Sequence, residues 1–159
     1  MIRALLTALS AALAAPVSAG TYGAAPPESV ASVEVLPGWR DGATHIAALR
    51  IRLAPGWKTY WRAPGDAGIP PVFSWDGSEN LKSVRLTWPV PEVFHLNGMR
   101  SLGYSHELVL PMQLTAGAGN APIRLAGTIE MGVCEAVCLP YSLTLDALLP
   151  AGGAPDPAI

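Results

Sequence analysis

The residues best suited to chemistry in this chain are its two cysteines, Cys134 and Cys138, which lie four positions apart. Thiols in an oxidising compartment pair readily, so these two can pair with each other. The bridge would close a ring of five residues, and the chain-entropy model gives it only about 2 kcal/mol of stabilisation, against about 4.7 kcal/mol for a 100-residue loop. A bond with so small an effect on the unfolded chain suits electron transfer better than architecture.

The elements on either side of the cysteines must bring the two sulfurs together. Residues 129–133 alternate as a strand that runs into Cys134. If that strand continued, the two Cα atoms would be about 13 Å apart, whereas a disulfide needs about 4.4–6.8 Å. The chain must therefore coil between the cysteines, as one helical turn or a tight loop, and Pro140 limits the continuation of any helix. Residues 141–145 are expected to return as the next strand.

The charged residues nearest to the pair in the sequence are Glu130 and Glu135, with no Lys, Arg or His beside them. Negative neighbours disfavour a thiolate. We therefore predict that the disulfide accepts attack by a partner's thiolate and that neither cysteine is a hyper-reactive nucleophile.

Two other uses of the cysteines are compatible with the sequence. The bridge could be a static clip in a secreted β-sandwich that binds proteins through its loops. The pair could also handle Cu(I), which prefers soft sulfur ligands, together with Met131 or one of the three histidines, His45, His95 and His106. Because the cysteine spacing is not a strong metal pattern and the histidines are scattered, we expect no bound cofactor or metal.

The first 19 residues are typical of a cleavable signal peptide. Arg3 provides the positive start, residues 4–15 form a short apolar stretch, and residues 17–19 are small, which predicts cleavage after Ala19. The stretch is shorter than the roughly 20 residues that span a bilayer. We expect a periplasmic protein with no stable membrane insertion after cleavage, although an uncleaved anchor or a buried helix would fit the same residues.

The composition argues against several kinds of partner. The net charge is −2 and becomes −3 once Arg3 is removed with the leader. A protein of this charge is poorly suited to nucleic acid or to anionic lipid. The 140 residues that remain are enough for one domain with a real core.

From Val30 onward, apolar and polar residues alternate with a period of two, and clusters of Gly, Pro, Asn and Asp separate the alternating segments. This pattern marks half-buried antiparallel strands joined by turns. The alternation is clearest over 49–53, 84–87, 108–114, 123–131 and 143–145. We therefore predict an all-β antiparallel sandwich, with Pro111 at an edge or a bulge.

The expected organisation is a flexible lead-in over 20–30, one sandwich over 31–149 and a disordered tail or the start of a linker over 150–159. Residues 64–71 should form an ordered crossover in which Gly65 and Gly68 adopt unusual backbone angles. Four tryptophans are expected to pack in the core or between the sheets. They are Trp57, Trp61, Trp75 and Trp88.

Several blocks of the chain together resemble a known family. The blocks are Gly56-Trp57-Lys58-Thr59-Tyr60-Trp61, Pro64-Gly65-Asp66-Ala67-Gly68-Ile69-Pro70-Pro71, Trp75, Trp88-Pro89-Val90-Pro91-Glu92-Val93-Phe94, Gly103-Tyr104, Leu110-Pro111 and Cys138-Leu139-Pro140. In their order and spacing they resemble the periplasmic N-terminal domain of the thiol:disulfide interchange protein DsbD, and especially its ScsB-like relatives. The resemblance covers roughly residues 33–149.

The resemblance implies an immunoglobulin-like β-sandwich with a redox pair, onto which Cys134 and Cys138 map. In the family, the domain takes electrons from a thioredoxin-like domain that a membrane-embedded domain reduces. It passes them to oxidised periplasmic proteins such as disulfide isomerases or cytochrome c maturation factors. For this chain, the thioredoxin-like donor and the membrane reductase would be separate chains. By analogy, Cys138 would form the first mixed disulfide.

Two departures from the family pattern concern the redox pair. The DsbD domain has five residues between its cysteines, whereas this chain has three, as in the ScsB-like branch, so the resemblance does not carry over DsbD's own partners. The DsbD domain also shields its disulfide with a loop that bears an aromatic cap. The corresponding region here is 95–104, in which Met99, Leu102 and Tyr104 are the candidates to cover the sulfurs.

Overall fold

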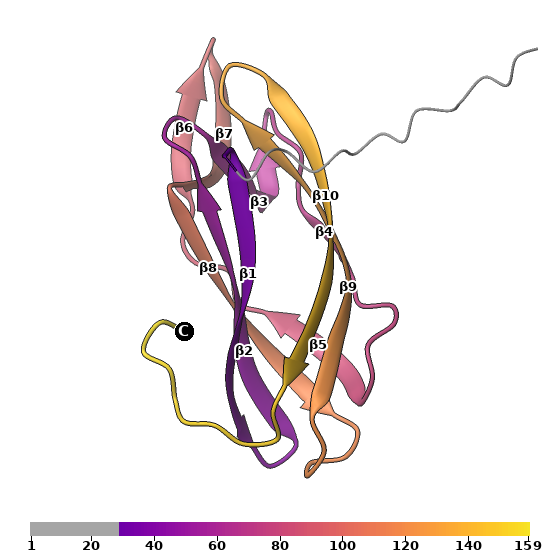
Figure 1. Ribbon diagram of the computed structural model, residues 1–159. Helices are drawn as coiled ribbons and strands as arrows, with labels where there is room; N and C mark the ends of the chain where they lie inside the picture. The colour runs from indigo at the N-terminus through magenta and orange to yellow at the C-terminus, as the bar shows by residue number, and fades with distance from the viewer. Residues whose placement is uncertain (1–28) are drawn as a thin grey trace, which may run out of the picture.

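The computed structural model describes residues 29–159, so the expected signal peptide and nearly all of the lead-in lie outside the described residues. The described residues form ten strands and no helix (Figure 1). The strands are β1 Ala31–Asp41, β2 Thr44–Leu53, β3 Lys58–Gly65, β4 Val72–Ser74, β5 Leu81–Leu86, β6 Glu92–Leu96, β7 Met99–Ser105, β8 Glu107–Ala116, β9 Ile123–Cys134 and β10 Cys138–Leu149. Residues 29–159 thus contain no helix with the length and apolar character of a membrane span.

The strands form two antiparallel sheets. One has the order β1-β2-β8-β5, and the other has the order β10-β9-β3-β7-β6, with β4 also paired to β9. Strand β9 pairs with β10 along its whole length. On its other edge, β9 pairs first with β4 and then, at its last two residues, with β3. The end of β9 therefore lies between two strands, in the interior of the second sheet.

The core lies between the two sheets. The alternation predicted from the sequence is confirmed, because the apolar residues of each predicted segment belong to one buried cluster. The contributions from β8 and β9 are Leu108, Leu110, Met112, Leu114, Ile123, Leu125, Ile129, Met131 and Val133. Each such side chain contributes roughly 1.5–3 kcal/mol when fully buried. The result is an immunoglobulin-like antiparallel β-sandwich.

The aromatic and glycine expectations also hold. All four predicted tryptophans pack against the core cluster while staying partly accessible. Gly65 and Gly68 have φ values of 87° and 127°, which favour glycine. Asp66 is tied to β7, since its carboxylate accepts a hydrogen bond from the Arg100 backbone N–H at 2.9 Å. The crossover between β3 and β4 is therefore an ordered segment attached to the second sheet.

Two local expectations are wrong. Pro111 is not at an edge, because β8 lies between β2 and β5, and it is not at a bulge, because its register with Ala48 is unshifted. Residues 95–104 are not a loop but most of the β6–β7 hairpin. Its turn is Asn97-Gly98, and both residues have positive φ, as a two-residue hairpin turn of type I′ requires.

The C-terminal residues 150–159 contain no strand and return toward β1 (Figure 1). A Cβ atom on Gly153 would lie only 2.7 Å from the backbone oxygen of Gly38. The tail thus approaches the irregular part of β1, between Leu36 and Trp39, where the pairing with β2 shifts register.

Candidate redox site

The two cysteines are bonded to each other at the tip of the β9–β10 hairpin. Cys134 ends β9, Cys138 begins β10, and the two are register partners with Cα atoms 4.0 Å apart. The three residues between them close a loop in which the Glu135 N–H donates to the Val137 carbonyl at 3.2 Å. Of the two geometries that pairing allowed, the structure has the tight loop, and the chain returns directly as a strand.

The two cysteines differ sharply in access. Cys134 is 2% exposed, whereas Cys138 is exposed. The sheet order explains this, because Cys134 lies on β9 between β10 and β3, while Cys138 lies on β10, an edge strand. Of the two bonded residues, Cys138 is therefore the one at the surface.

The disulfide lies on the outer face of the second sheet. Thr59 on β3 and Val133 on β9 are register partners and point into the core, where both are buried. Alternation places their neighbours on the opposite face, so Cys134, Lys58 and Tyr60 share the outer face. Here the Tyr60 hydroxyl lies 3.6 Å from the Cys138 Sγ.

Tyr60 is covered, although it lies on the outer face. Its side chain is 4% exposed, and this burial raises the pKa of its phenol. The β3–β4 crossover lies over it, since a Cβ on Gly68 would be 2.5 Å from the Tyr60 ring. The next residue, Ile69, lies over Gly132, where an added Cβ would be 2.7 Å from the Ile69 Cβ. The crossover thus covers the outer face next to the disulfide.

The sheet pairs a lysine with the buried cysteine, but the charged end of that lysine lies toward β6, on the other side of β3 from Cys134. Lys58 is the register partner of Cys134 on β3, and its Nζ lies 5.0 Å from the centre of the Phe94 ring on β6, within the range of a cation–π interaction. Along the sequence no Lys, Arg or His flanks the pair, but the sheet pairs one with Cys134.

Two of the three predicted cap residues, Tyr104 and Leu102, lie on the core side of the second sheet. Tyr104 is the register partner of Thr59 and therefore faces the core. Its ring is 5% exposed and stacks on Trp88, its hydroxyl donates to the Pro89 carbonyl at 2.8 Å, and burial raises its pKa to about 12. Leu102 alternates onto the same side as Tyr104, and Met99 is exposed at the start of β7. The aromatic residues that share the outer face with the disulfide are Tyr60 and Phe94.

Two of the four residues proposed as Cu(I) ligands, Met131 and His45, lie away from the disulfide. Met131 is buried in the core on the face opposite to Cys134. His45 is bound to Pro37 and Arg40, and Arg40 in turn binds the loop that leads into β9. Since β9 spans 12 residues, that end is about 36 Å from Cys134. Within residues 29–159 there is no cluster of three or more His, Cys, Asp or Glu side chains.

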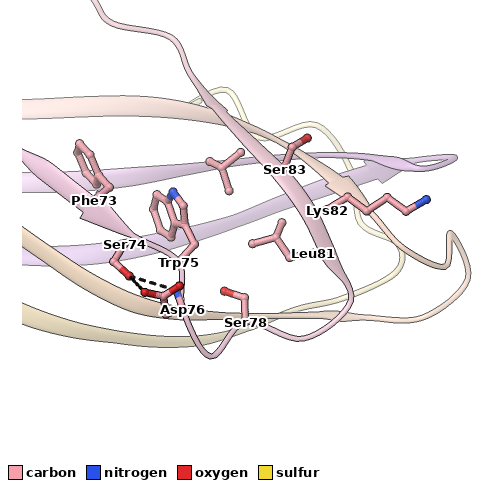
Figure 2. A pocket seen from close by; sticks show the side chains of 9 residues that line it. Phe73, Ser74, Trp75, Asp76, Ser78, Leu81, Lys82 and Ser83 are labelled. Atoms are coloured by element: carbon pink, nitrogen blue, oxygen red, sulfur yellow. Dashed lines mark hydrogen bonds between the residues drawn. The ribbon is translucent and has the colours of Figure 1, made fainter.

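An open pocket lies apart from the disulfide, where the chain leads from β4 to β5. Figure 2 shows Phe73 and Trp75 on one side of it and Leu81 and Lys82 on the other. The Phe73 register partner on β9 is Ile129, five residues from Cys134 and therefore about 16 Å away along the strand. The pocket thus does not belong to the cysteine site.

The comparisons with known proteins agree with this fold and pair. The family described as "Thiol:disulfide interchange protein DsbD, N-terminal" matches residues 24–150. The N-terminal periplasmic domain of ScsB from Proteus mirabilis is similar in structure, with a TM-score of 0.56 and 28% identity over 73% of this chain and 43% of that one. The chain thus spans less than half the length of that structure.

A second solved structure is the DsbD N-terminal domain of Neisseria meningitidis in the reduced form. Its TM-score is 0.44, with 21% identity over 80% of this chain and 90% of that one. No curated protein matches the sequence. Because the family match spans nearly the whole described chain, the resemblance noted in the sequence is confirmed, and this protein belongs to the family of the N-terminal domain of the thiol:disulfide interchange protein DsbD.

Proposed function

We propose that this chain is a periplasmic thiol–disulfide exchange domain that relays electrons through Cys134 and Cys138. Its donor would be a thioredoxin-like protein, reduced in turn by a membrane reductase on a separate chain. Its acceptors would be oxidised periplasmic proteins. Family membership and the bonded cysteine pair support exchange in general. Export with cleavage after Ala19 is part of the proposal and depends on the leader-like residues 1–19.

The observation that carries the proposal is the unequal exposure of the two bonded cysteines. Cys138 is exposed at the tip of a hairpin, and its bonded partner Cys134 is buried. Thiol–disulfide exchange requires that one sulfur be attacked from outside while the other leaves. This arrangement supports Cys138 as the residue that forms the mixed disulfide.

The exchange then has two steps. The donor's thiolate attacks the Cys138 Sγ, a new S–S bond forms between them, and Cys134 leaves with the bonding electrons as a thiolate that takes up a proton. The donor's second thiol loses its proton and attacks the donor's own bridged sulfur, which releases Cys138 as a thiolate that is protonated in turn. The chain has gained two electrons and two protons, and the donor has become a disulfide. The same steps in reverse reduce an acceptor.

The alternative of a static clip in a secreted binding module predicts a different redox behaviour. Structural disulfides have reduction potentials below about −300 mV, whereas exchanging pairs have higher ones. The exposure of Cys138 favours exchange. For the Cu(I) alternative, two of the four ligands that the sequence offered, Met131 and His45, lie away from the sulfurs.

The test combines a measurement of the reduction potential of the cysteine pair with the trapping of a mixed disulfide. The full chain is equilibrated with dithiothreitol buffers of known potential, and the variant Cys134→Ser is produced with its leader in the native compartment. We expect a potential above about −300 mV and a mixed disulfide on Cys138 with a thioredoxin-like protein. The matched control is the double variant with Cys138→Ser, which should trap nothing. A potential below −300 mV would establish the static clip instead.

A further inference from the structure

We propose that Tyr60 is a positioning residue for the exchange reaction, in that its hydroxyl donates a hydrogen bond to the Cys138 sulfur and stabilises the Cys138 thiolate. The inference deepens the proposed function and depends on it for its biological meaning. The hydrogen bond from the Tyr60 hydroxyl to the Cys138 thiolate is itself a property of the isolated protein.

The direction of the hydrogen bond follows from the chemistry of the two atoms. The Tyr60 oxygen lies 3.6 Å from the Cys138 Sγ, within reach of a hydrogen bond to sulfur. A disulfide sulfur and a thiolate carry no proton, so in both states the phenol must be the donor. A hydrogen bond to the charged form of a group favours that form.

The surroundings keep Tyr60 in place and protonated. The ring is almost fully buried and lies against Gly68 of the crossover. Burial raises the pKa of the phenol above its usual 10, so the hydroxyl keeps its proton at neutral pH. By contrast, the hydroxyl of the equally buried Tyr104 is bound to the Pro89 carbonyl on the core side of the sheet. Of Tyr60 and Tyr104, Tyr60 is thus the one whose hydroxyl lies beside the sulfur.

The Tyr60 hydroxyl matters in the second step when the chain accepts electrons, and in the first step when it donates them. When a partner's second thiol resolves the mixed disulfide, the S–S bond to the partner breaks and Cys138 leaves with the electron pair. The Tyr60 hydroxyl is already in place to receive that charge. When the reduced chain later attacks an acceptor, the same bond increases the fraction of Cys138 that is thiolate at a given pH.

Other charged groups near the pair also affect the thiolate. Lys58 on β3 is the register partner of Cys134. Glu130 alternates onto the outer face of β9, and the Glu135 carboxylate in the hairpin loop approaches Gly56. These groups are the same in a protein with Tyr or Phe at position 60. The comparison of Tyr60→Phe with the parent therefore isolates the hydroxyl.

The experiment uses the Cys134→Ser variant, in which Cys138 is the one thiol. Its pKa is measured from the pH dependence of alkylation by iodoacetamide, with and without Tyr60→Phe. A hydrogen bond to a charged group is worth enough to expect a rise of about one pKa unit, and about tenfold less thiolate at neutral pH. Tyr104→Phe is the matched control and should leave the Cys138 pKa unchanged.

An unchanged Cys138 pKa in a folded Tyr60→Phe protein would overturn the inference. If Tyr60→Phe does not fold, 3-fluorotyrosine incorporated into the Cys134→Ser protein provides the test, because its more acidic phenol is a stronger donor and must lower the Cys138 pKa. No partner protein enters either measurement. A failed trap with a shifted pKa would therefore count against the electron relay, and an unshifted pKa with a successful trap would count only against Tyr60.

Discussion

The β9–β10 hairpin is closed in two different ways at its two ends. At the tip, Cys134 and Cys138 are joined covalently. At the base, Arg124 on β9 donates to Asp146 on β10 at 2.7 Å and to Glu79 at 3.1 Å. All three side chains at the base are largely in solvent. Exposed ion pairs form and break constantly and stabilise little, whereas a disulfide opens only when another thiol attacks it.

The difference indicates what each end must control. At the base, nothing needs to be protected, and water can compete freely with the ion pairs. At the tip, the proposed exchange consumes the bond, so access to it would decide the rate. The tip accordingly combines a buried sulfur, an exposed sulfur and a covering crossover that contains Ile69. Val137, beside Cys138, is an apolar side chain that is 68% exposed, as suits a surface that another protein must contact.

The largest expected effect concerns the two sulfurs. In Cys134→Ser the remaining thiol is exposed, and in Cys138→Ser it is buried. Because the buried thiol must wait for local opening, we expect iodoacetamide to modify Cys138→Ser at least about 100-fold more slowly than Cys134→Ser. In urea the two should react at equal rates. Equal rates in the folded proteins would contradict the asymmetry on which the proposed mechanism depends.

The next effect concerns the β3–β4 crossover, which covers the outer face next to the disulfide. In Gly132→Ala, the new methyl group would lie 2.7 Å from the Ile69 Cβ, so the crossover must shift. We expect a loss of about 1–3 kcal/mol in the free energy of unfolding and faster reduction of the disulfide by dithiothreitol. Gly152→Ala is the control, since nothing lies within 4 Å of its added Cβ. Urea denaturation and a reduction time course measure the two quantities, and a Gly132→Ala protein that matches Gly152→Ala in both would show that the cover has no effect.

The third effect is a pH dependence of the free energy of unfolding that comes from His45, near the base of the hairpin. His45 is fully buried and accepts a hydrogen bond from Arg40, whose guanidinium also binds the loop before β9. Burial first, and then Arg40, lower the pKa of His45 below 6.5, against the opposing effect of the Pro37 carbonyl. The folded protein therefore binds fewer protons than the unfolded chain below pH 6.5.

The sign of the pH effect follows directly. The stabilisation is complete above the unfolded pKa of 6.5 and is lost as the pH falls below it, with a slope of up to about 1.4 kcal/mol per pH unit. Urea denaturation between pH 7 and pH 5 should show this slope in the parent. His45→Gln should remove the slope, and His95→Gln, at an exposed site, should retain it. A slope that survives His45→Gln would assign it to another group.

The strands and the cysteine loop are the parts that the sequence predicts well. Alternation locates a strand because the residues on its core face must be buried together. It does so correctly for β2, β5, β8, β9 and β10, whereas it gave no signal for β3, β4, β6 and β7. The disulfide distance is equally local, since a limit of about 7 Å between two Cα atoms four residues apart leaves only compact loops. Family resemblance added the sandwich type, which alternation alone does not specify.

The neighbours of the disulfide are beyond such reasoning. Tyr60 lies beside the Cys138 sulfur, and Lys58 is paired with Cys134, because β3 pairs with the end of β9 in one register. A register is a property of two strands, not of either one. A signal for the β6–β7 hairpin was present in Asn97-Gly98, a pair typical of two-residue turns. This turn signal predicts a regular strand that contains Tyr104, and a residue on a regular strand faces either the core or the outer side of the sheet.

Pro111 illustrates a different limit. Proline in a central strand removes one ladder hydrogen bond, which favours an edge. In the structure β5 ends at Leu86, opposite Met112, so the nitrogen of Pro111 faces chain that has already left the sheet. Its carbonyl still accepts from the Thr87 N–H at 2.9 Å. A proline is thus tolerated inside a sheet where a neighbouring strand stops, and the lengths of neighbouring strands are not encoded locally.

The smallest expected effect returns to the base of the hairpin. Asp146→Asn removes the carboxylate whose pKa is lowered by its hydrogen bonds from Arg124. Because this carboxylate is fully in solvent, we expect a change in the urea midpoint close to the error of the measurement at neutral pH, and a smaller one in 1 M salt. A lowered carboxyl pKa contributes stability only above its unfolded value, so even this effect should vanish as the pH falls below 4. If Asp146→Asn lowered the free energy of unfolding as much as Gly132→Ala, the ion pairs at the base would stabilise the protein as much as the packing around the disulfide does. The proposed contrast between the two ends of the hairpin would then be wrong.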